Sequence, residues 1–140
     1  MRPEAFLEVA DELAVGDAPR LRSAVSRAYY AVFHVASRAT VELGGPARSS
    51  SHDLVGNRFQ SSGDPAVSEL GQRFLNLKAA RHRADYTLAD GLDVDDQATV
   101  ATLVREARGL VAAFAHLPRG DLRGAAAGAI AAYERMLRGR

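Results

Sequence analysis

Residues 21–40 read LRSAVSRAYYAVFHVASRAT, and apolar residues recur through them at every third or fourth position. At roughly 100° per residue, this spacing gives a helix with one almost wholly apolar side. That side consists of six aliphatic residues: Leu21, Val25, Ala28, Val32, Val35 and Ala39. Four more residues widen the apolar face to nearly half of the cylinder: Tyr29, Phe33, Ala36 and Thr40. A face that broad must contact at least two neighbours, so we expect this helix to be the central element of the fold.

Helix signals continue on both sides of this segment. Asp17 is a suitable N-cap for the central helix, and the run Gly44-Gly45-Pro46 ends it. We expect five further helices, over residues 3–15, over 52–59, from Asp64-Pro65 to a turn at 90–93, over 93–117 and over 121–137. Ser50 or Ser51 would cap the helix over 52–59, and residues 47–51 would form a loop. No segment alternates with a period of two. The sequence therefore predicts an all-α protein, an up-down helical bundle with short connections and an extra C-terminal helix.

Composition limits the classes of function. A chain of 140 residues forms one domain, and the absence of cysteine excludes disulfides, zinc–thiolate sites and cysteine nucleophiles. A net charge of +1 neither requires nor forbids a nucleic-acid partner. The four histidines lack metal-ligand spacing and there is no glycine-rich phosphate loop, so we expect no metal and no cofactor. No apolar run is long enough to span a membrane and no signal peptide begins the chain, so we expect a cytoplasmic protein.

The side of the central helix opposite its apolar face carries one narrow polar stripe. It consists of Ser23, Arg27, Tyr30, His34 and Arg38. The stripe is either a solvated surface or the lining of a groove, within one molecule or at a dimer interface. Arginine, aromatic and histidine side chains in such an arrangement are typical of surfaces that stack on single-stranded RNA.

The fourth predicted helix ends in the most chemically suggestive segment, RHRADY at residues 81–86. The apolar track of this helix continues onto Arg81, so we expect the Arg81 side chain to point inward. An unpaired buried guanidinium is very costly, and Asp85 or Asp90 is the expected partner. The segment is either a structural ion pair or an anion site, in which Arg81 or Arg83 faces a cavity and Asp85 orients it.

Two motifs resemble a known family. Residues 26–36, SRAYYAVFHVA, precede a loop histidine, His52, and then the RHRADY segment. This order resembles HEPN domains, in particular the small stand-alone bacterial and archaeal branch, over residues 4–117. The resemblance implies a HEPN-like bundle over residues 1–118, with residues 119–140 as an appended helix of the same domain. It also implies a homodimer.

HEPN proteins of known activity are mostly metal-independent ribonucleases of toxin–antitoxin and defence systems. Their motif places a histidine four to six residues after an arginine, and neither Arg81 nor Arg83 has a histidine at that spacing. We therefore expect a non-catalytic component of a toxin–antitoxin or defence-type module that binds RNA, a nucleotide or a protein partner, such as a nucleotidyltransferase-type protein. Two alternatives stay open, a ribonuclease with a rearranged site and a structural or assembly bundle.

The resemblance and the polar stripe together name the candidate residues. The expected binding residues are Arg27, Tyr30, His34, His52, Arg81, Arg83, Asp85 and Tyr86. If the protein cuts RNA, the candidate catalytic residues are Arg81, His82, Tyr86 and His34, with His52 as a further histidine.

Overall fold

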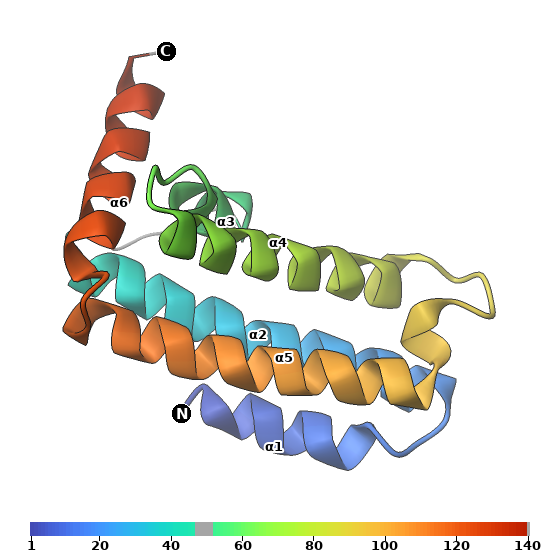
Figure 1. Cartoon of the computed structure of the whole chain (residues 1–140). Coiled ribbons are helices and arrows are strands. Elements are labelled where there is room, and N and C mark those ends of the chain that lie inside the picture. The colour runs from blue at the N-terminus through green and yellow to red at the C-terminus, as the bar shows by residue number, and fades with distance from the viewer. Residues whose placement is uncertain (47–51, 140) are drawn as a thin grey trace.

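The computed structural model describes residues 1–46 and 52–139, and within them the chain forms six packed α-helices and no strand. The helices are α1 (Glu4–Leu13), α2 (Ala18–Glu42), α3 (His52–Gln60), α4 (Pro65–Tyr86), α5 (Gln97–His116) and α6 (Arg123–Arg138). Two short 3-10 helices flank α5, η1 (Asp93–Asp95) and η2 (Leu117–Arg119). The four helices α1, α2, α4 and α5 run alternately up and down, and α6 turns away from them at one end (Figure 1). The all-α class and the up-down arrangement are thus confirmed.

Aspartates cap three of the helices, as the sequence predicts for Asp17 and Asp64. The fifth helix is predicted to begin at 93, but residues Asp93–Asp95 form η1 and α5 begins at Gln97. Asp17 accepts a hydrogen bond from the backbone N–H of Arg20, and Asp64 accepts from two backbone N–H groups at the start of α4. Asp96 caps α5 by accepting from the N–H of Thr99 at 2.9 Å. Each such cap contributes about 1 kcal/mol. The predicted caps at Ser50 and Ser51 and the loop over 47–51 lie outside the described residues.

The last helix begins later than the sequence predicts. It starts at Arg123 rather than at Asp121, and the residue before it, Leu122, offers no side-chain cap. The N–H of Arg123 bonds to the carbonyl of Gly120, which places Asp121 inside a turn instead of in the first turn of the helix.

Helix α2 is the centre of the core. It contacts α1, α4 and α5, and its whole predicted aliphatic face is buried. The burial extends beyond that face, because Ala24, Ala31 and Ser26 are also buried. Alanines let neighbouring helix backbones approach closely, so a core with few aromatic residues still packs densely.

The short helix α3 packs against both α4 and α6. At Gly71 of α4 an added Cβ would lie 2.1 Å from the backbone nitrogen of Gln60, so the two backbones can approach only because this residue is glycine. On its other side α3 contacts α6. There the buried Arg58, 2% exposed, places its Nε 2.7 Å from Oε1 of Glu134. The sequence gives no signal for this ion pair, which attaches the appended helix to the bundle.

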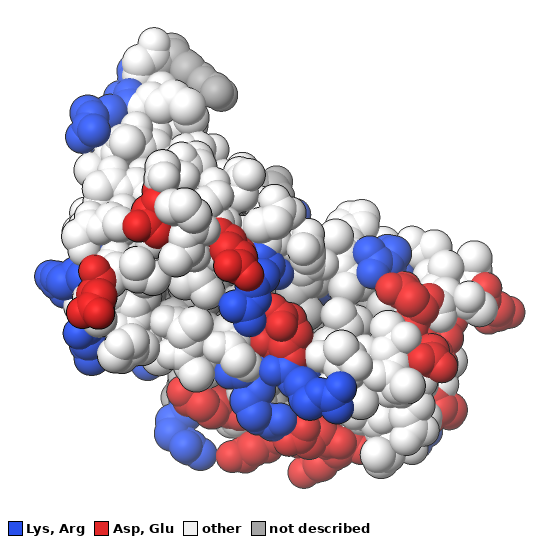
Figure 2. Space-filling view, in the orientation of Figure 1, with Lys and Arg blue, Asp and Glu red and all other residues white. Residues whose placement is uncertain are grey.

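Charges of both signs are interspersed on the face that α4 and α5 present in Figure 2. Acidic side chains gather at the end that holds the segment between α4 and α5, which carries Asp90, Asp93, Asp95 and Asp96. This face therefore offers no continuous basic surface. Among the described residues, no helix is long and apolar enough to cross a membrane.

Candidate functional site

The middle of α2 and the end of α4 bring most of the predicted site residues together. We call five of them the α2–α4 cluster: Arg27, Tyr30, Arg81, Asp85 and Tyr86. The first two lie one turn apart on α2, and the last three lie within the final two turns of α4. The cluster is possible because α4 packs directly on α2.

Arg81 is the centre of this cluster, and its inward direction is confirmed. Its side chain is 13% exposed, and its Nη2 donates to the Tyr30 hydroxyl at 3.1 Å. Its Nε lies 3.1 Å from Oδ2 of Asp85, but the N–H is not aligned with that oxygen, so the contact is an ion pair without a hydrogen bond. The guanidinium also lies over three rings, with Cζ 5.4 Å, 5.5 Å and 5.7 Å from the centroids of Tyr29, Tyr30 and Tyr86.

This environment keeps Arg81 charged. Burial lowers the pKa of the guanidinium, whereas the hydrogen bond to Tyr30 and the charge of Asp85 raise it. The net shift of the Arg81 pKa is upward, so the side chain is a permanent cation.

Arg27 supplies a second cation. Its Cζ lies 5.0 Å from the centroid of the Tyr30 ring and 5.8 Å from that of Phe6, on α1. Its only hydrogen bond within the described residues is a long one, 3.5 Å from Nη2 to Oγ of Ser26. No carboxylate of the described part of the chain pairs with Arg27, so its charge is available to a ligand.

Asp85 is held from two sides. Besides its pair with Arg81, its Oδ2 accepts a hydrogen bond from the Ser26 hydroxyl at 3.3 Å. The Asp85 side chain is 28% exposed. The carboxylate thus lies at the rim of the cluster, where an incoming anion would meet it.

His52 reaches the same region from the first residue of α3. Its Nδ1 lies 2.7 Å from the Tyr29 hydroxyl, and its ring stacks on Phe33 with centroids 3.9 Å apart. Tyr29 is fully buried. A buried tyrosine needs a partner for its hydroxyl, so His52 has a structural role whatever else it does.

The other two candidate histidines lie at the edges of the cluster. His34 is exposed and stacks on Phe6, with ring centroids 5.6 Å apart and an interplanar angle of 13°. His82 is also exposed, and its ring centroid lies 4.8 Å from that of Tyr86, which is itself 63% exposed. The edges of the cluster therefore present rings to solvent.

Arg83 does not join the cluster. It forms a two-bond pair with Asp93 of η1, with Nη2–Oδ2 at 2.8 Å and Nε–Oδ1 at 3.2 Å. The hydrogen bond from Arg83 lowers the pKa of Asp93 despite the opposing effect of burial. The described contacts of Arg83 therefore serve the segment after α4 rather than the site.

A second arginine holds the same segment. The Nε and Nη2 of Arg22 bond to the two carboxylate oxygens of Asp95 at 2.6 Å and 2.9 Å, and its terminal nitrogens also donate to the carbonyls of Thr87 and Ala89. The hydrogen bond from Arg22 is the main reason that the pKa of Asp95 falls to about 2. The turn after α4 is thereby fixed to α2, and the end of α4 with it.

The sequence missed four residues that support the site: Phe6, Ser26, Tyr29 and Phe33. The polar stripe of α2 includes none of them. A signal existed for Tyr29, because its hydroxyl on an apolar face must find a partner. No signal existed for Phe6, since nothing in the sequence places α1 beside the middle of α2.

The geometry offers two cations and several exposed rings. Among the side chains that the structure describes, no three His, Cys, Asp or Glu residues lie close enough together to hold a metal ion. Guanidinium groups beside aromatic rings bind phosphates and stack on bases. No protein-family model matches the chain, and neither a curated protein nor a solved structure is significantly similar to it.

Proposed function

We propose that this chain is a HEPN-like protein that binds single-stranded RNA through the α2–α4 cluster without cutting it. The observation that carries the proposal is the placement of two guanidinium groups over one tyrosine ring. Arg27 and Arg81 both lie over Tyr30, and Arg27 has no carboxylate partner among the described residues. Such a surface attracts the phosphates of RNA and offers rings on which unpaired bases stack.

The absence of cutting is proposed from the arrangement of the histidines. In the HEPN ribonucleases that this chain resembles, a histidine beside the phosphate takes up the RNA 2′-hydroxyl proton, and an arginine stabilises the phosphate. His82 lies next to Arg81 in sequence, but its ring packs on Tyr86, while His34 packs on Phe6. His52 engages the buried Tyr29 hydroxyl through one of its two ring nitrogens.

The resemblance to HEPN domains adds two further parts to the proposal. The protein forms a homodimer, and it acts with a nucleotidyltransferase-type protein in a toxin–antitoxin or defence-type module. Light scattering of the purified protein tests the first part, with a mass twice that of the chain expected and a monomer contradicting it.

Fluorescence anisotropy with a labelled single-stranded RNA tests the binding itself. Tyr86→Ala removes an exposed stacking ring, and base–ring stacking contributes about 1–3 kcal/mol, so affinity falls by roughly 5- to 150-fold. Leu88→Ala is the matched control, since Leu88 is 89% exposed and lies two residues away. Arg27→Gln also weakens binding, whereas Arg105→Gln, on the exposed side of α5, does not. Equal affinity in all variants would refute the site.

The same mixtures separate binding from cleavage. After incubation in EDTA, gel electrophoresis of the RNA shows the full-length strand if the proposal holds. RNA decay that Arg81→Ala abolishes would instead establish the metal-independent ribonuclease. Folded protein that neither binds nor cuts RNA would leave the structural bundle as the remaining alternative.

A further inference from the structure

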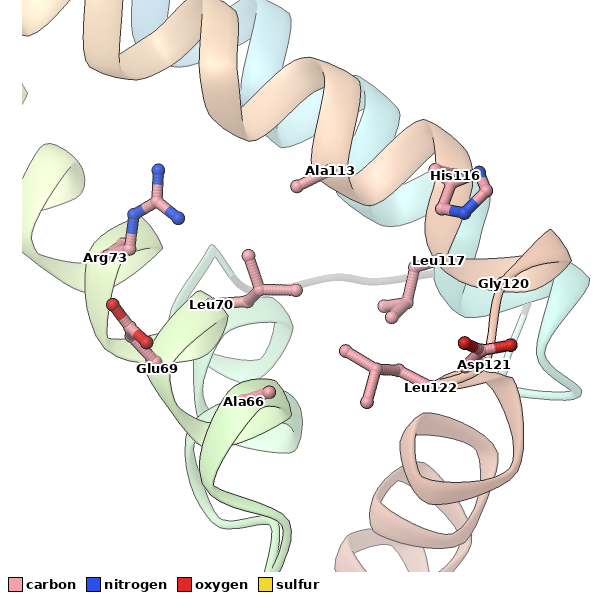
Figure 3. A pocket seen from close by; sticks show the side chains of 10 residues that line it. All are labelled: Ala66, Glu69, Leu70, Arg73, Ala113, His116, Leu117, Gly120, Asp121 and Leu122. Carbon is pink, nitrogen blue, oxygen red and sulfur yellow. The ribbon is translucent and has the colours of Figure 1, made fainter.

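A second feature lies at the other end of the molecule, where α4 begins and α5 ends. A cavity of about 310 Å³ opens between these helices and the turn that leads into α6. Figure 3 shows three leucine side chains, Leu70, Leu117 and Leu122, converging in it, with Ala66 and Ala113 completing its wall. The volume lies at the small end of the range for ligand pockets, and the wall is apolar, as such pockets usually are.

Two opposite charges stand at one side of this cavity. Glu69 and Arg73 are one turn apart on α4, and no ion pair joins them. Arg73 uses its Nε to bond Oε1 of Glu106 at 2.6 Å, which fixes the guanidinium in place. The two terminal nitrogens of Arg73 have no hydrogen bond within the described residues, and one of them is directed toward the leucines in Figure 3. Glu69 likewise forms no hydrogen bond or ion pair with the described residues, so both groups have capacity for a ligand.

Arg73 stays protonated, because its surroundings raise its pKa. The hydrogen bond to Glu106 raises its pKa, burial lowers it by less, and the charges of Glu106 and Glu69 raise it further. A ligand made only of an anion would be attracted by Arg73 but repelled by Glu69, Glu106 and Asp121, which also lines the cavity. A ligand made only of a cation would be attracted by these carboxylates but would leave the terminal nitrogens of Arg73 without an acceptor.

We propose that this cavity binds a small zwitterion with a short aliphatic tail, the chemistry of a branched-chain α-amino acid. Its carboxylate accepts from the terminal nitrogens of Arg73, and its ammonium group donates to Glu69. Its tail packs among the three leucines, and the tail is short because His116 and Asp121 bound the far side of the cavity (Figure 3). None of these residues belongs to the α2–α4 cluster, so the site is independent of RNA binding.

A heteronuclear NMR titration with L-leucine tests the proposal. For a ligand of this size we expect a dissociation constant on the order of 1 mM, with shifts confined to the residues around the cavity. Three partial ligands are the matched controls. 4-Methylpentanoate lacks the ammonium group, 3-methylbutylamine lacks the carboxylate, and glycine lacks the tail. Each is expected to bind at least about tenfold more weakly.

Two variants test the location. Ala66→Phe places a ring in the cavity from an exposed position and is expected to abolish binding. Ala98→Phe is its control, because Ala98 is also an exposed alanine in the second position of a helix, α5. Glu69→Gln is expected to weaken leucine binding by about tenfold and to leave 4-methylpentanoate binding no weaker.

Three results would overturn the proposal. The first is the absence of shifts at about 20 mM L-leucine, well above the expected constant. The second is 4-methylpentanoate or 3-methylbutylamine binding as tightly as leucine. The third is full leucine binding by Ala66→Phe.

Discussion

Asp85→Asn is predicted to tighten RNA binding, which is the opposite of what a mutation in a binding site usually does. The Asp85 carboxylate lies 3.1 Å from Nε of Arg81 and occupies the side of the guanidinium that a phosphate would use. If the proposed site binds RNA, this carboxylate competes with the RNA backbone for Arg81. Asparagine keeps the size of the side chain and an oxygen for the Ser26 hydroxyl, and it removes the charge.

The size of the effect follows from Coulomb's law. A phosphate bound to Arg81 would lie about 6 Å from the Asp85 carboxylate, where the repulsion of two unit charges is about 0.7 kcal/mol in water and about 2.8 kcal/mol at an effective dielectric constant of 20. These limits correspond to roughly 3-fold and 100-fold in affinity. Because the Asp85 side chain is 28% exposed, solvent screens it, and we expect a gain of about 3- to 10-fold.

The assay is fluorescence anisotropy with single-stranded RNA at two salt concentrations. Asp93→Asn is the matched control, since Asp93 pairs with Arg83 outside the cluster, and its affinity should stay within error of the wild type. The gain in Asp85→Asn should shrink at high salt, because screening weakens the repulsion that the mutation removes. Weaker or unchanged binding by Asp85→Asn, with the fold intact by circular dichroism, would refute the competitor argument.

Three further predictions concern stability. Gly71→Ala should lower the free energy of unfolding in urea by about 1–3 kcal/mol, because its Cβ would meet the backbone of α3. Gly128→Ala is the control, since Gly128 lies in open space on α6, and it should be neutral or stabilising by up to about 1 kcal/mol. Equal effects of the two mutations would contradict the close approach of α3 and α4 at Gly71. Glu134→Gln removes the charge that pairs with the buried Arg58, so it should lower the free energy of unfolding by about 1–3 kcal/mol and speed amide hydrogen exchange across α6. Unchanged exchange in α6 would show that this ion pair does not hold α6 to the bundle. The pKa of Asp95 is about 2 in the folded state against an ordinary value of 3.8, so its stabilisation is full above about pH 5 and is lost as pH falls through about 2. Asp95→Asn should flatten this part of the pH–stability curve, and an unchanged slope would count against the pair with Arg22.

Much of the fold could be predicted because its determinants are local. Asp17, Asp64 and Asp96 each cap a helix that an apolar period of three to four residues then continues. The same period placed Arg81 on the inner face of α4, and the structure confirms it. The start of α6 was predicted wrongly, because a turn between Gly120 and Arg123 separates Asp121 from the helix.

The partners of the arginines could not be predicted, because they depend on tertiary packing. Arg22 meets Asp95 across 73 residues, and Arg58 meets Glu134 across 76. The sequence grouped Arg83 with Arg81, and the two diverge because side chains two positions apart on a helix do not face the same side. Which residues bind RNA stays a prediction.

Photocrosslinking identifies the residues that contact the RNA. A single-stranded RNA that carries 5-iodouridine is bound to the protein in EDTA and irradiated, and mass spectrometry then identifies the joined residues. We predict cross-links to exposed or half-exposed rings of the α2–α4 cluster, Tyr86 and Tyr30, with the RNA recovered at full length. Cross-links confined to α5 or α6 would rule out the α2–α4 cluster as the RNA site, and RNA cut in an Arg81-dependent way would show that the protein is a ribonuclease.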